Sequence, residues 1–445
     1  MTLDKWGNPV SYQSREAVRR LEQAIEKLHA YQADPLADID AVLIDHPGFV
    51  MAHALRASML VTTTDRAFEP ELRKSVEAAE ALSAGANERE RSYIAAARAW
   101  LDGDLERGSE RWGRIAITWP RDSLAIQLAQ LGDFFLGYSH MLRDRVARVL
   151  PHWDRSVPGY GFIRGMYAFG LEESGDYVKA EAIGREAVGI NPQDGWAAHA
   201  VAHVMEMQGR AEDGIEFLAS TAPGWSPNSM FAYHNWWHKA LFHIDRCEFK
   251  AALDLFDQRV SAGGFGQALE LIDGSALLWR LAAAGQDVGN RWTDIAEKWA
   301  SRIEHGVYAF NDLHAMLAFV ATGRNDAQTA LIRNLERVAA GRGTNAMMTR
   351  EIGLPALKGI AAFGRGAYGD TLEYLLPLRG KANRFGGSHA QRDIFSWTLV
   401  EAALRAGDRA VAEGLIAERL SVKPESRINL AFDERVCRLP TRIAA

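Results

Sequence analysis

Residues 165–192 read GMYAFGLEESGDYVKAEAIGREAVGINP, and this stretch decides the fold. Small Ala168 lies in a first apolar segment that ends at Gly175. A second segment begins there, carries Ala180, and stops before Pro192. Glycine adopts the left-handed backbone that lets a chain leave a helix, whereas proline lacks the N–H that would continue one. The stretch therefore predicts two helices joined by a glycine turn.

The same spacing recurs along the chain. Residues 96–120 repeat it, with Gly103 at the turn and Pro120 at the stop. Weaker copies occupy 196–220, 234–260, 273–300, 311–337 and 393–424. A period of about 34 residues with helix–turn–helix units is the tetratricopeptide pattern. No alternating strand or hairpin run is found, so the sequence predicts an all-α protein, a right-handed α-solenoid of tetratricopeptide-type helix pairs.

The predicted organisation is one continuous helical-repeat domain, 1–445. Within it we expect N-terminal helices at about 12–60, repeats over 85–430 and a C-terminal tail at 431–445. The predicted loops are 151–160, 221–230, 261–267 and 379–390. None is long enough or polar enough for a flexible linker between domains.

Composition limits the function classes. The net charge of −6 argues against a broad surface for nucleic acid or anionic membrane, so we expect no partner of either kind. Two cysteines, Cys247 and Cys437, are too few for a disulfide framework or a cysteine zinc site. The polar N-terminal sequence does not resemble a signal peptide, and no apolar run is long enough to span a membrane. A cytoplasmic protein is the expectation, and a homo-oligomer is left open.

The stretch WAAHAVAHVMEMQGR, residues 196–210, is an unusual helix. His199, His203 and Glu206 fall within about 60° of one another at helical spacing, with Trp196 beside them. The next predicted repeat carries His234 and His238 one turn apart, with Asn235 and Trp237 next to them and His243 on the opposite side. Because equivalent helices of adjacent repeats stack, these two stripes are expected to converge in one groove.

Other polar groups lie where later helices are expected to begin. They are Asp273 in LIDGSALLW, then Asn311, Asp312 and His314 in FNDLHAMLAF, and His389, Gln391, Arg392 and Asp393 in GGSHAQRD. The glycines of this last segment are more typical of a tight turn than of an anion cradle, because no Walker spacing follows.

Several segments together resemble the tetratricopeptide repeat protein 38 family. They are PGFVMAHAL, NERERSYIAAARAWLDGD, WPRDSLAIQLAQ, YAFGLEESGDY, DGWAAHAVAHVMEMQGR, HNWWHKALFHI, FNDLHAMLAF and GGSHAQRD. The resemblance runs from about residue 40 to about residue 410, and its most distinctive parts are the two histidine segments. It implies an α-solenoid with a closed-up groove and leaves the biochemical role open.

Three functions compete for the histidine stripes. The favoured hypothesis is an enzyme or binder of a small polar or carbonyl molecule, with hydrolytic or proton-transfer chemistry in the groove. Its catalytic candidates are His199, His203, Glu206, His234, His238, Asp312 and His314. Its substrate-binding candidates are Trp196, Asn235, Trp237, Asp273, Asn311, His389, Gln391, Arg392 and Asp393.

A divalent ion is one version of this hypothesis. Paired imidazoles at i, i+4 can place two nitrogens on one ion, and the ligand set would come from His199, His203, His234, His238 and Glu206. The alternatives are a peptide-binding or protein-binding scaffold without catalysis, and a purely structural network of satisfied buried histidines. No H-E-x-x-H, G-x-S-x-G or Walker motif decides among them.

Overall fold

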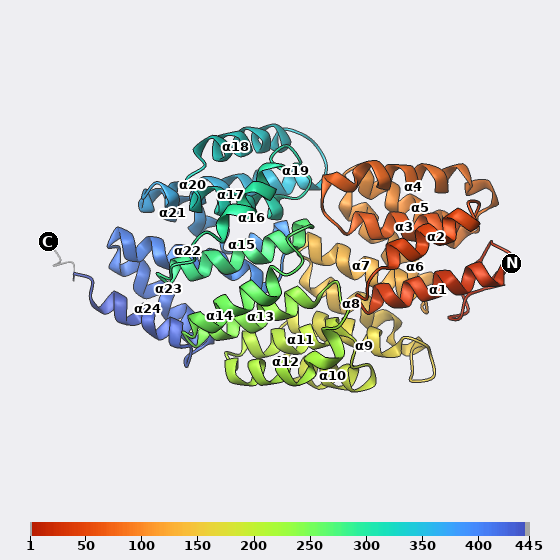
Figure 1. Cartoon of the computed structure of the whole chain (residues 1–445), viewed down its shortest axis with the longest axis horizontal. Helices are drawn as coiled ribbons and strands as arrows, with labels where there is room; N and C mark the ends of the chain where they lie inside the picture. The colour runs from red at the N-terminus through yellow and green to blue at the C-terminus, as the bar shows by residue number, and fades with distance from the viewer. Residues whose placement is uncertain (1, 441–445) are drawn as a thin grey trace. The chain divides into compact units, whose positions relative to one another are not determined.

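The computed structural model describes residues 2–440, and nearly all regular structure in that range is helical (Figure 1). The prediction of an all-α array of helix pairs is confirmed. The chain divides into two compact units, residues 1–201 with 221–232 and residues 202–220 with 233–445. The prediction of a single continuous domain is not decided by this division and stays a prediction.

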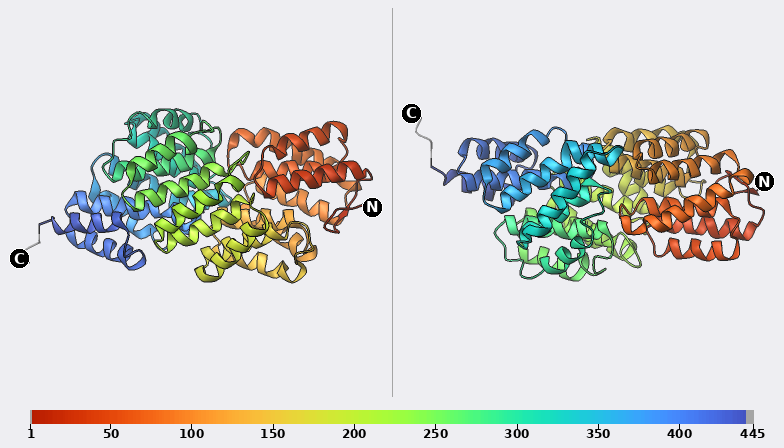
Figure 2. Two further views of the ribbon diagram at one scale, coloured as in Figure 1. Left: turned by 60° about the horizontal axis from the view of Figure 1, so that its bottom comes forward. Right: turned by 90° about the horizontal axis from the view of Figure 1, so that it is seen from above.

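The first unit begins with a small hairpin and continues as consecutive helices. Its elements are β1 (Thr2–Leu3), β2 (Pro9–Val10), α1 (Arg15–His29), α2 (Pro35–Asp45), α3 (Val50–Val61), α4 (Glu69–Ala81), α5 (Glu88–Leu101), α6 (Leu105–Thr118), α7 (Ser123–Leu136), α8 (Ser139–Val149), α9 (Tyr160–Glu173) and α10 (Tyr177–Ile190), with short 3-10 turns η1 (Arg66–Phe68), η2 (Ser83–Gly85) and η3 (Leu150–His152). Neighbours in sequence pack together, as can be followed from red to yellow in Figure 2.

The boundary between the units falls within a run of three helices. They are α11 (Gly195–Met207), α12 (Ala211–Trp225) and α13 (Ala232–Asp245). The predicted loop at 221–230 is wrong in its first part, because α12 continues to Trp225. That indole is fully buried, and its Nε1 donates to Thr221 Oγ1 at 3.0 Å one turn earlier.

The second unit continues the same pairing of consecutive helices. Its elements are α14 (Phe249–Leu255), α15 (Ala268–Ala283), α16 (Trp292–Ala300), α17 (Ala309–Ala321), α18 (Asn325–Ala339), α19 (Thr344–Met348), α20 (Leu354–Gly364), α21 (Tyr368–Leu375), α22 (His389–Ala406), α23 (Arg409–Val422) and α24 (Arg427–Cys437), with π turns η4 (Phe256–Val260) and η5 (Thr349–Gly353) and 3-10 turns η6 (Leu376–Leu378) and η7 (Ala382–Phe385). The expected tail at 431–445 overlaps α24, and its residues 441–445 lie outside the described part of the chain.

The glycines and the proline of the repeat pattern have the structural roles that were predicted for them. Gly175 has φ +82° between α9 and α10, in the left-handed region that side chains avoid. A Cβ on Gly184 of α10 would lie 2.6 Å from Val201 Cγ2, so only glycine lets α10 approach α11 this closely. Pro192 follows directly after α10 ends. The small residues and the helix-ending proline therefore determine how these helices pair.

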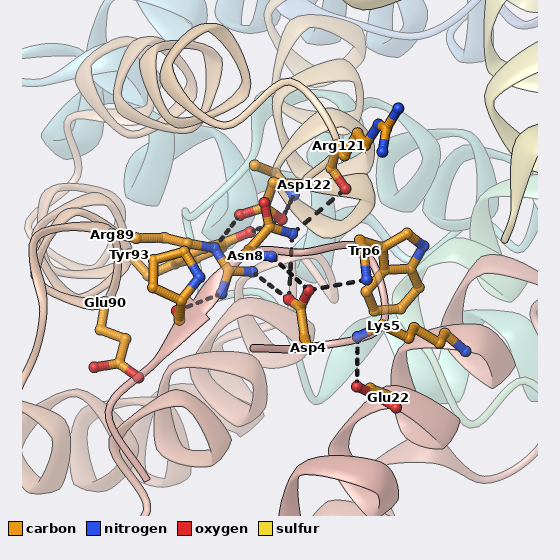
Figure 3. A network of polar contacts seen from close by, with 12 residues as sticks. Asp4, Lys5, Trp6, Asn8, Glu22, Arg89, Glu90, Tyr93, Arg121 and Asp122 are labelled. Atoms are coloured by element: carbon orange, nitrogen blue, oxygen red, sulfur yellow. Dashed lines mark hydrogen bonds and ion pairs between the residues drawn. The ribbon is translucent and has the colours of Figure 1, made fainter. Parts of the chain in front are cut away.

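The N-terminal hairpin is a feature that the sequence did not predict. Asp4 Oδ1 accepts from the backbone N–H groups of Trp6 and Asn8, which closes the turn at 3.0 and 2.8 Å. Arg89 of α5 lies between two carboxylates, with Nε 2.5 Å from Asp122 Oδ2 and a guanidinium nitrogen 3.5 Å from Asp4 (Figure 3). This buried ion network joins the hairpin to α5 and to the start of α7.

Replacing Arg89 with Met is expected to lower the free energy of unfolding by about 3–5 kcal/mol, because it leaves two buried carboxylates without their cation. Arg185→Met is the control, since Arg185 is 47% exposed and pairs with Glu181 one turn earlier on its own helix. That change should cost no more than about 0.5 kcal/mol. Urea unfolding followed by circular dichroism measures both, and equal losses would contradict a structural role for the network.

Candidate functional site

Two helices carry the histidine stripes, and helical spacing sets each stripe. Asp194 Oδ1 accepts from the backbone N–H of Ala197 at 3.0 Å and so caps the start of α11. His199 and His203 lie one turn apart on that helix, as predicted from their spacing. His234 and His238 lie one turn apart on α13 in the same way. His203, His234 and His238 belong to the second unit, and His199 belongs to the first.

His203, His234 and His238 form what we call the imidazole cluster. A ring nitrogen from each lies within 4.8 Å of those of the other two. The ring centroids of His203 and His238 are 4.5 Å apart, and those of His234 and His238 are 4.9 Å apart with perpendicular planes. Residues 31 to 35 positions apart in the chain thus meet at one point.

Two of these rings each have their own carboxylate partner. His234 Nδ1 is 2.6 Å from Asp273 Oδ2, and His238 Nδ1 is 3.0 Å from Glu206 Oε2. A carboxylate acceptor favours the proton on Nδ1, which leaves the lone pair on Nε2. Asp273 lies inside α15 instead of at its start, so the helix body presents it to α13. Glu206 comes from the predicted stripe of α11.

Burial determines the charge state of His238 within the cluster. His203 and His238 have no exposed surface, and His234 is 8% exposed. Burial, reinforced by the neighbouring His203 and His234, lowers the pKa of His238 well below its usual value. Burial also raises the pKa of Asp273, although the nearby His234 opposes this shift. His238 is therefore a neutral imidazole at physiological pH, the form that binds metal ions.

Trp237 forms a wall of the cluster. Its ring stacks on His234 at 5.3 Å and 12°, and it meets His238 edge-on at 4.8 Å. The guanidinium carbon of Arg280 lies 5.6 Å from the ring centroid of Trp237. Asn235, next to His234 in the chain, is fully buried.

Trp196 and His199 have aromatic surroundings within the first unit. Their ring centroids are 5.0 Å apart, and both rings contact Phe169 and Phe231. Tyr31 stacks on Trp196 at 5.7 Å and 19°. The predicted pocket-wall role of Trp196 stays a prediction, and its observed contacts are those of a packed aromatic group.

The polar start of α17 holds two buried ionisable groups. Asp312 is 5% exposed and its Oδ2 has no hydrogen-bond partner among residues 2–440, so burial raises its pKa to about 8. His314 Nδ1 is 2.8 Å from the Phe310 carbonyl oxygen, and burial lowers the pKa of His314 to about 4. Near neutral pH both side chains are therefore uncharged. Asn311 is 7% exposed on the same helix.

The segment that opens α22 is mainly a structural cap. Ser388 and Gln391 form a capping box, and Arg392 donates to the Gly387 carbonyl oxygen. Asp393 pairs with Arg419 at 2.6 Å, and His389 is exposed. The expected turn is thus present. The substrate-binding roles predicted for this segment stay predictions, and they concern His389, Gln391, Arg392 and Asp393.

Arg280, Arg419 and Lys423 are polar groups that sequence reasoning missed. They line a small inner recess of the second unit, with a cavity volume of about 20 Å³, together with Glu206, Asp245 and Asp393. A weak signal existed for Arg280, because it is the single basic residue in the apolar run LIDGSALLWRLAAAG. Arg419 lies in the charged helix α23, and Lys423 directly follows that helix. Neither residue stood out in the sequence.

Comparison with known proteins leaves the family open. No family model matches the chain, so the resemblance to the tetratricopeptide repeat protein 38 family stays a prediction. A solved structure of a monomeric IFIT1 mutant with Gppp-AAAA is similar at a TM-score of 0.37 and 15% identity, covering 96% of this chain and 100% of that one. At this level the likeness assigns neither a family nor a ligand to the present protein.

One prediction about partners is nevertheless corrected. The exclusion of a nucleic-acid partner is not upheld, since the similar structure contains Gppp-AAAA, a ligand that belongs to that protein. The exclusion rested on a net charge of −6, which describes the whole chain and does not report local basic patches. Among the residues that the structure describes, no helix combines the length and apolar character needed to cross a membrane.

Asp312→Asn is expected to change how stability depends on pH. Because the folded pKa of Asp312 is about 8 and the unfolded value about 3.9, the folded state retains a proton that the unfolded state releases. As pH rises from about 4 to about 8, this carboxyl therefore lowers the free energy of unfolding. The decrease is at most about 1.4 kcal/mol per pH unit. The variant should lose less stability than the wild type between pH 5 and pH 8.

Urea unfolding at five pH values measures this difference. Asp326→Asn, at an exposed position of α18, is the control and should follow the wild-type pH dependence. An Asp312→Asn curve parallel to that of the wild type would show that Asp312 is not a buried neutral acid.

Proposed function

We propose that this protein is an enzyme or binder of a small polar molecule, and that the imidazole cluster is its centre and holds a divalent ion. The observation that carries the proposal is the convergence of three buried imidazoles, two of which have a carboxylate on the ring nitrogen Nδ1. This geometry supports hydrolytic or proton-transfer chemistry.

The donor set fits a metal ion for a specific chemical reason. Ligating histidines usually donate their second ring N–H to a carboxylate or carbonyl, which fixes the tautomer and the ring orientation. Asp273 does this for His234, and Glu206 does it for His238. Three imidazoles suit Zn²⁺, and a catalytic zinc site keeps a fourth position for water or substrate. His199, one turn before His203 on α11, is a further ligand candidate.

Burial strengthens the argument against a merely structural cluster. An apolar side chain would fill the same volume without the cost of moving imidazoles and carboxylates out of water. Imidazoles held close together and away from water are the ligands that a cation would stabilise. Trp237 covers His234 and restricts the approach of water from that side.

The reaction that we propose is acid–base chemistry on a polar or carbonyl substrate. A bound divalent ion would activate water or polarise a carbonyl group. Asp273 and Glu206 would hold the rings in orientation. Asp312 keeps its proton up to about pH 8 and is our candidate for the proton donor. In a metal-free version, an imidazole of the cluster would accept the proton directly.

His238→Ala is expected to weaken Zn²⁺ binding by more than about 100-fold, because it removes a ligand, whereas loss of a supporting carboxylate alone costs about 10–100-fold. His243→Ala is the matched control on the same helix, since His243 contacts Glu248 and lies outside the cluster. Isothermal titration with Zn²⁺ after chelator treatment measures affinity and stoichiometry, and circular dichroism checks the fold. We expect one ion per chain in the wild type and in the control.

The outcomes separate the competing functions. Wild-type protein that binds no ion but hydrolyses p-nitrophenyl acetate, with loss of turnover in His238→Ala, would support the metal-free version and contradict the metal centre. A third outcome is wild-type protein that shows neither ion binding nor turnover and co-purifies with a stoichiometric polypeptide. This outcome would contradict both the metal-bound and the metal-free version and favour the scaffold.

A further inference from the structure

The first unit contains a small cavity that the proposed function does not use. Its volume is about 10 Å³, which is the space of a single water-sized molecule. Its wall includes His29 at the end of α1, Asp194 directly before α11, and Trp196 in the first turn of α11. Each of these three side chains is at most 8% exposed. The cavity is therefore enclosed by the packed helices of the first unit.

Three polar atoms of this wall have no hydrogen-bond partner among residues 2–440. They are His29 Nε2, Asp194 Oδ2 and Trp196 Nε1. Native proteins pair most buried polar groups, either with another protein group or with ordered water. Three unpaired atoms on the wall of one cavity therefore indicate a ligand that forms hydrogen bonds with all of them.

The surroundings of two of these atoms determine whether they donate or accept. His29 Nδ1 lies 2.9 Å from Gln127 Oε1, and an amide oxygen accepts hydrogen bonds. Nδ1 therefore carries the ring proton. Burial lowers the pKa of His29 to about 4, so the ring is neutral near neutral pH and its Nε2 is an acceptor. The indole N–H of Trp196, in contrast, is a donor only.

Asp194 uses its two oxygens differently. Oδ1 accepts from the backbone N–H of Ala197 at 3.0 Å and caps α11. Oδ2 lies next to Gly165 of α9, where a Cβ would be only 3.0 Å away, so the glycine leaves room for this oxygen. Burial raises the pKa of Asp194 to about 7. Near neutral pH, Oδ2 is thus an acceptor in the ionised carboxylate and a donor in the protonated carboxyl group.

We propose that this cavity binds one ordered water molecule, which bridges His29, Asp194 and Trp196. The water donates to His29 Nε2 and to the ionised Asp194, and it accepts from the Trp196 N–H. When Asp194 is protonated, the second lone pair of the water accepts from the carboxyl group, so water suits both charge states. The bridge joins the end of α1 to the start of α11.

The same three atoms argue against other occupants of this cavity. Ammonium and metal cations have no lone pair with which to accept from the Trp196 N–H. An organic ligand is larger than the available volume of about 10 Å³. The ligand is therefore a molecule of the size of water that both donates and accepts hydrogen bonds.

Contacts between water and the indole N–H groups of the full-length protein test the proposal. Nuclear Overhauser spectroscopy on protein with isotope-labelled tryptophan should show a cross-peak between water and the Trp196 N–H, which is assigned by its loss in Trp196→Phe. Trp153 is the internal control in the same unit. Its Nε1 donates directly to the Pro120 carbonyl oxygen at 2.7 Å, so it should show no such cross-peak.

His29→Leu removes one acceptor of the water and should abolish the Trp196 cross-peak. His140→Leu is the matched control, because His140 is exposed on α8, and it should leave the cross-peak unchanged. The melting temperatures of both variants are measured alongside. If His29→Leu does not fold, the comparison of Trp196 with Trp153 in the wild-type protein still decides the question.

Four results would overturn the assignment. The first two are a wild-type protein without a water cross-peak at Trp196, and cross-peaks of equal strength at Trp196 and Trp153. The third is an undiminished Trp196 cross-peak in folded His29→Leu. The fourth is a Trp196 signal that shifts with ammonium chloride but not with sodium chloride at the same ionic strength, which would assign the cavity to a cation.

Discussion

The burial of imidazoles against carboxylates is the constraint on which the rest of the second unit depends. His234 and His238 lie on one face of α13, and their Nδ1 atoms meet Asp273 of α15 and Glu206 of α11. Each hydrogen bond joins a different helix to α13. The positions of three helices are therefore linked to the orientation of two rings. A cluster built this way is arranged before any ligand arrives, which lowers the cost of binding one.

Buried ionisable groups in this chain have two kinds of surroundings. In the first unit, Arg89 faces Asp4 and Asp122, and a second buried arginine, Arg145, contacts Asp133 with its Nε at 2.5 Å. These carboxylates have cations, and the networks stabilise the helix array. In the second unit His238 is neutral, Asp312 keeps its proton near neutral pH, and Arg280 has no carboxylate oxygen within 4.0 Å among residues 2–440. Neither unit is uniform, because Asp194 of the first is a buried carboxyl whose pKa burial raises to about 7, and Asp393 of the second pairs with Arg419 at 2.6 Å.

Much of the fold could be predicted, because it depends on local rules. Gly175 and Pro192 mark their turn and stop as expected, and the helical spacing placed His203 beside Glu206 and His234 beside His238. The pairing of α20 and α21 was missed, since its turn glycine, Gly366, lies among other glycines that dilute the signal. The N-terminal hairpin was missed because two-residue strands carry no periodicity.

The site was only partly predictable. The convergence of α11 and α13 follows from repeat stacking, but the contact between His234 and Asp273 spans 39 residues and depends on how α15 packs. Arg280 and Lys423 meet at one recess across even longer separations, which no local pattern encodes. Helical spacing thus identifies the faces, while tertiary packing determines which faces share a centre.

Anomalous diffraction at the zinc absorption edge, from crystals of the full chain grown with Zn²⁺, tests the central claim most directly. The account predicts one anomalous peak, bonded at about 2.0–2.1 Å to imidazole nitrogens of His203, His234 and His238. Rings that point to separate surroundings, with no peak between them, would contradict it.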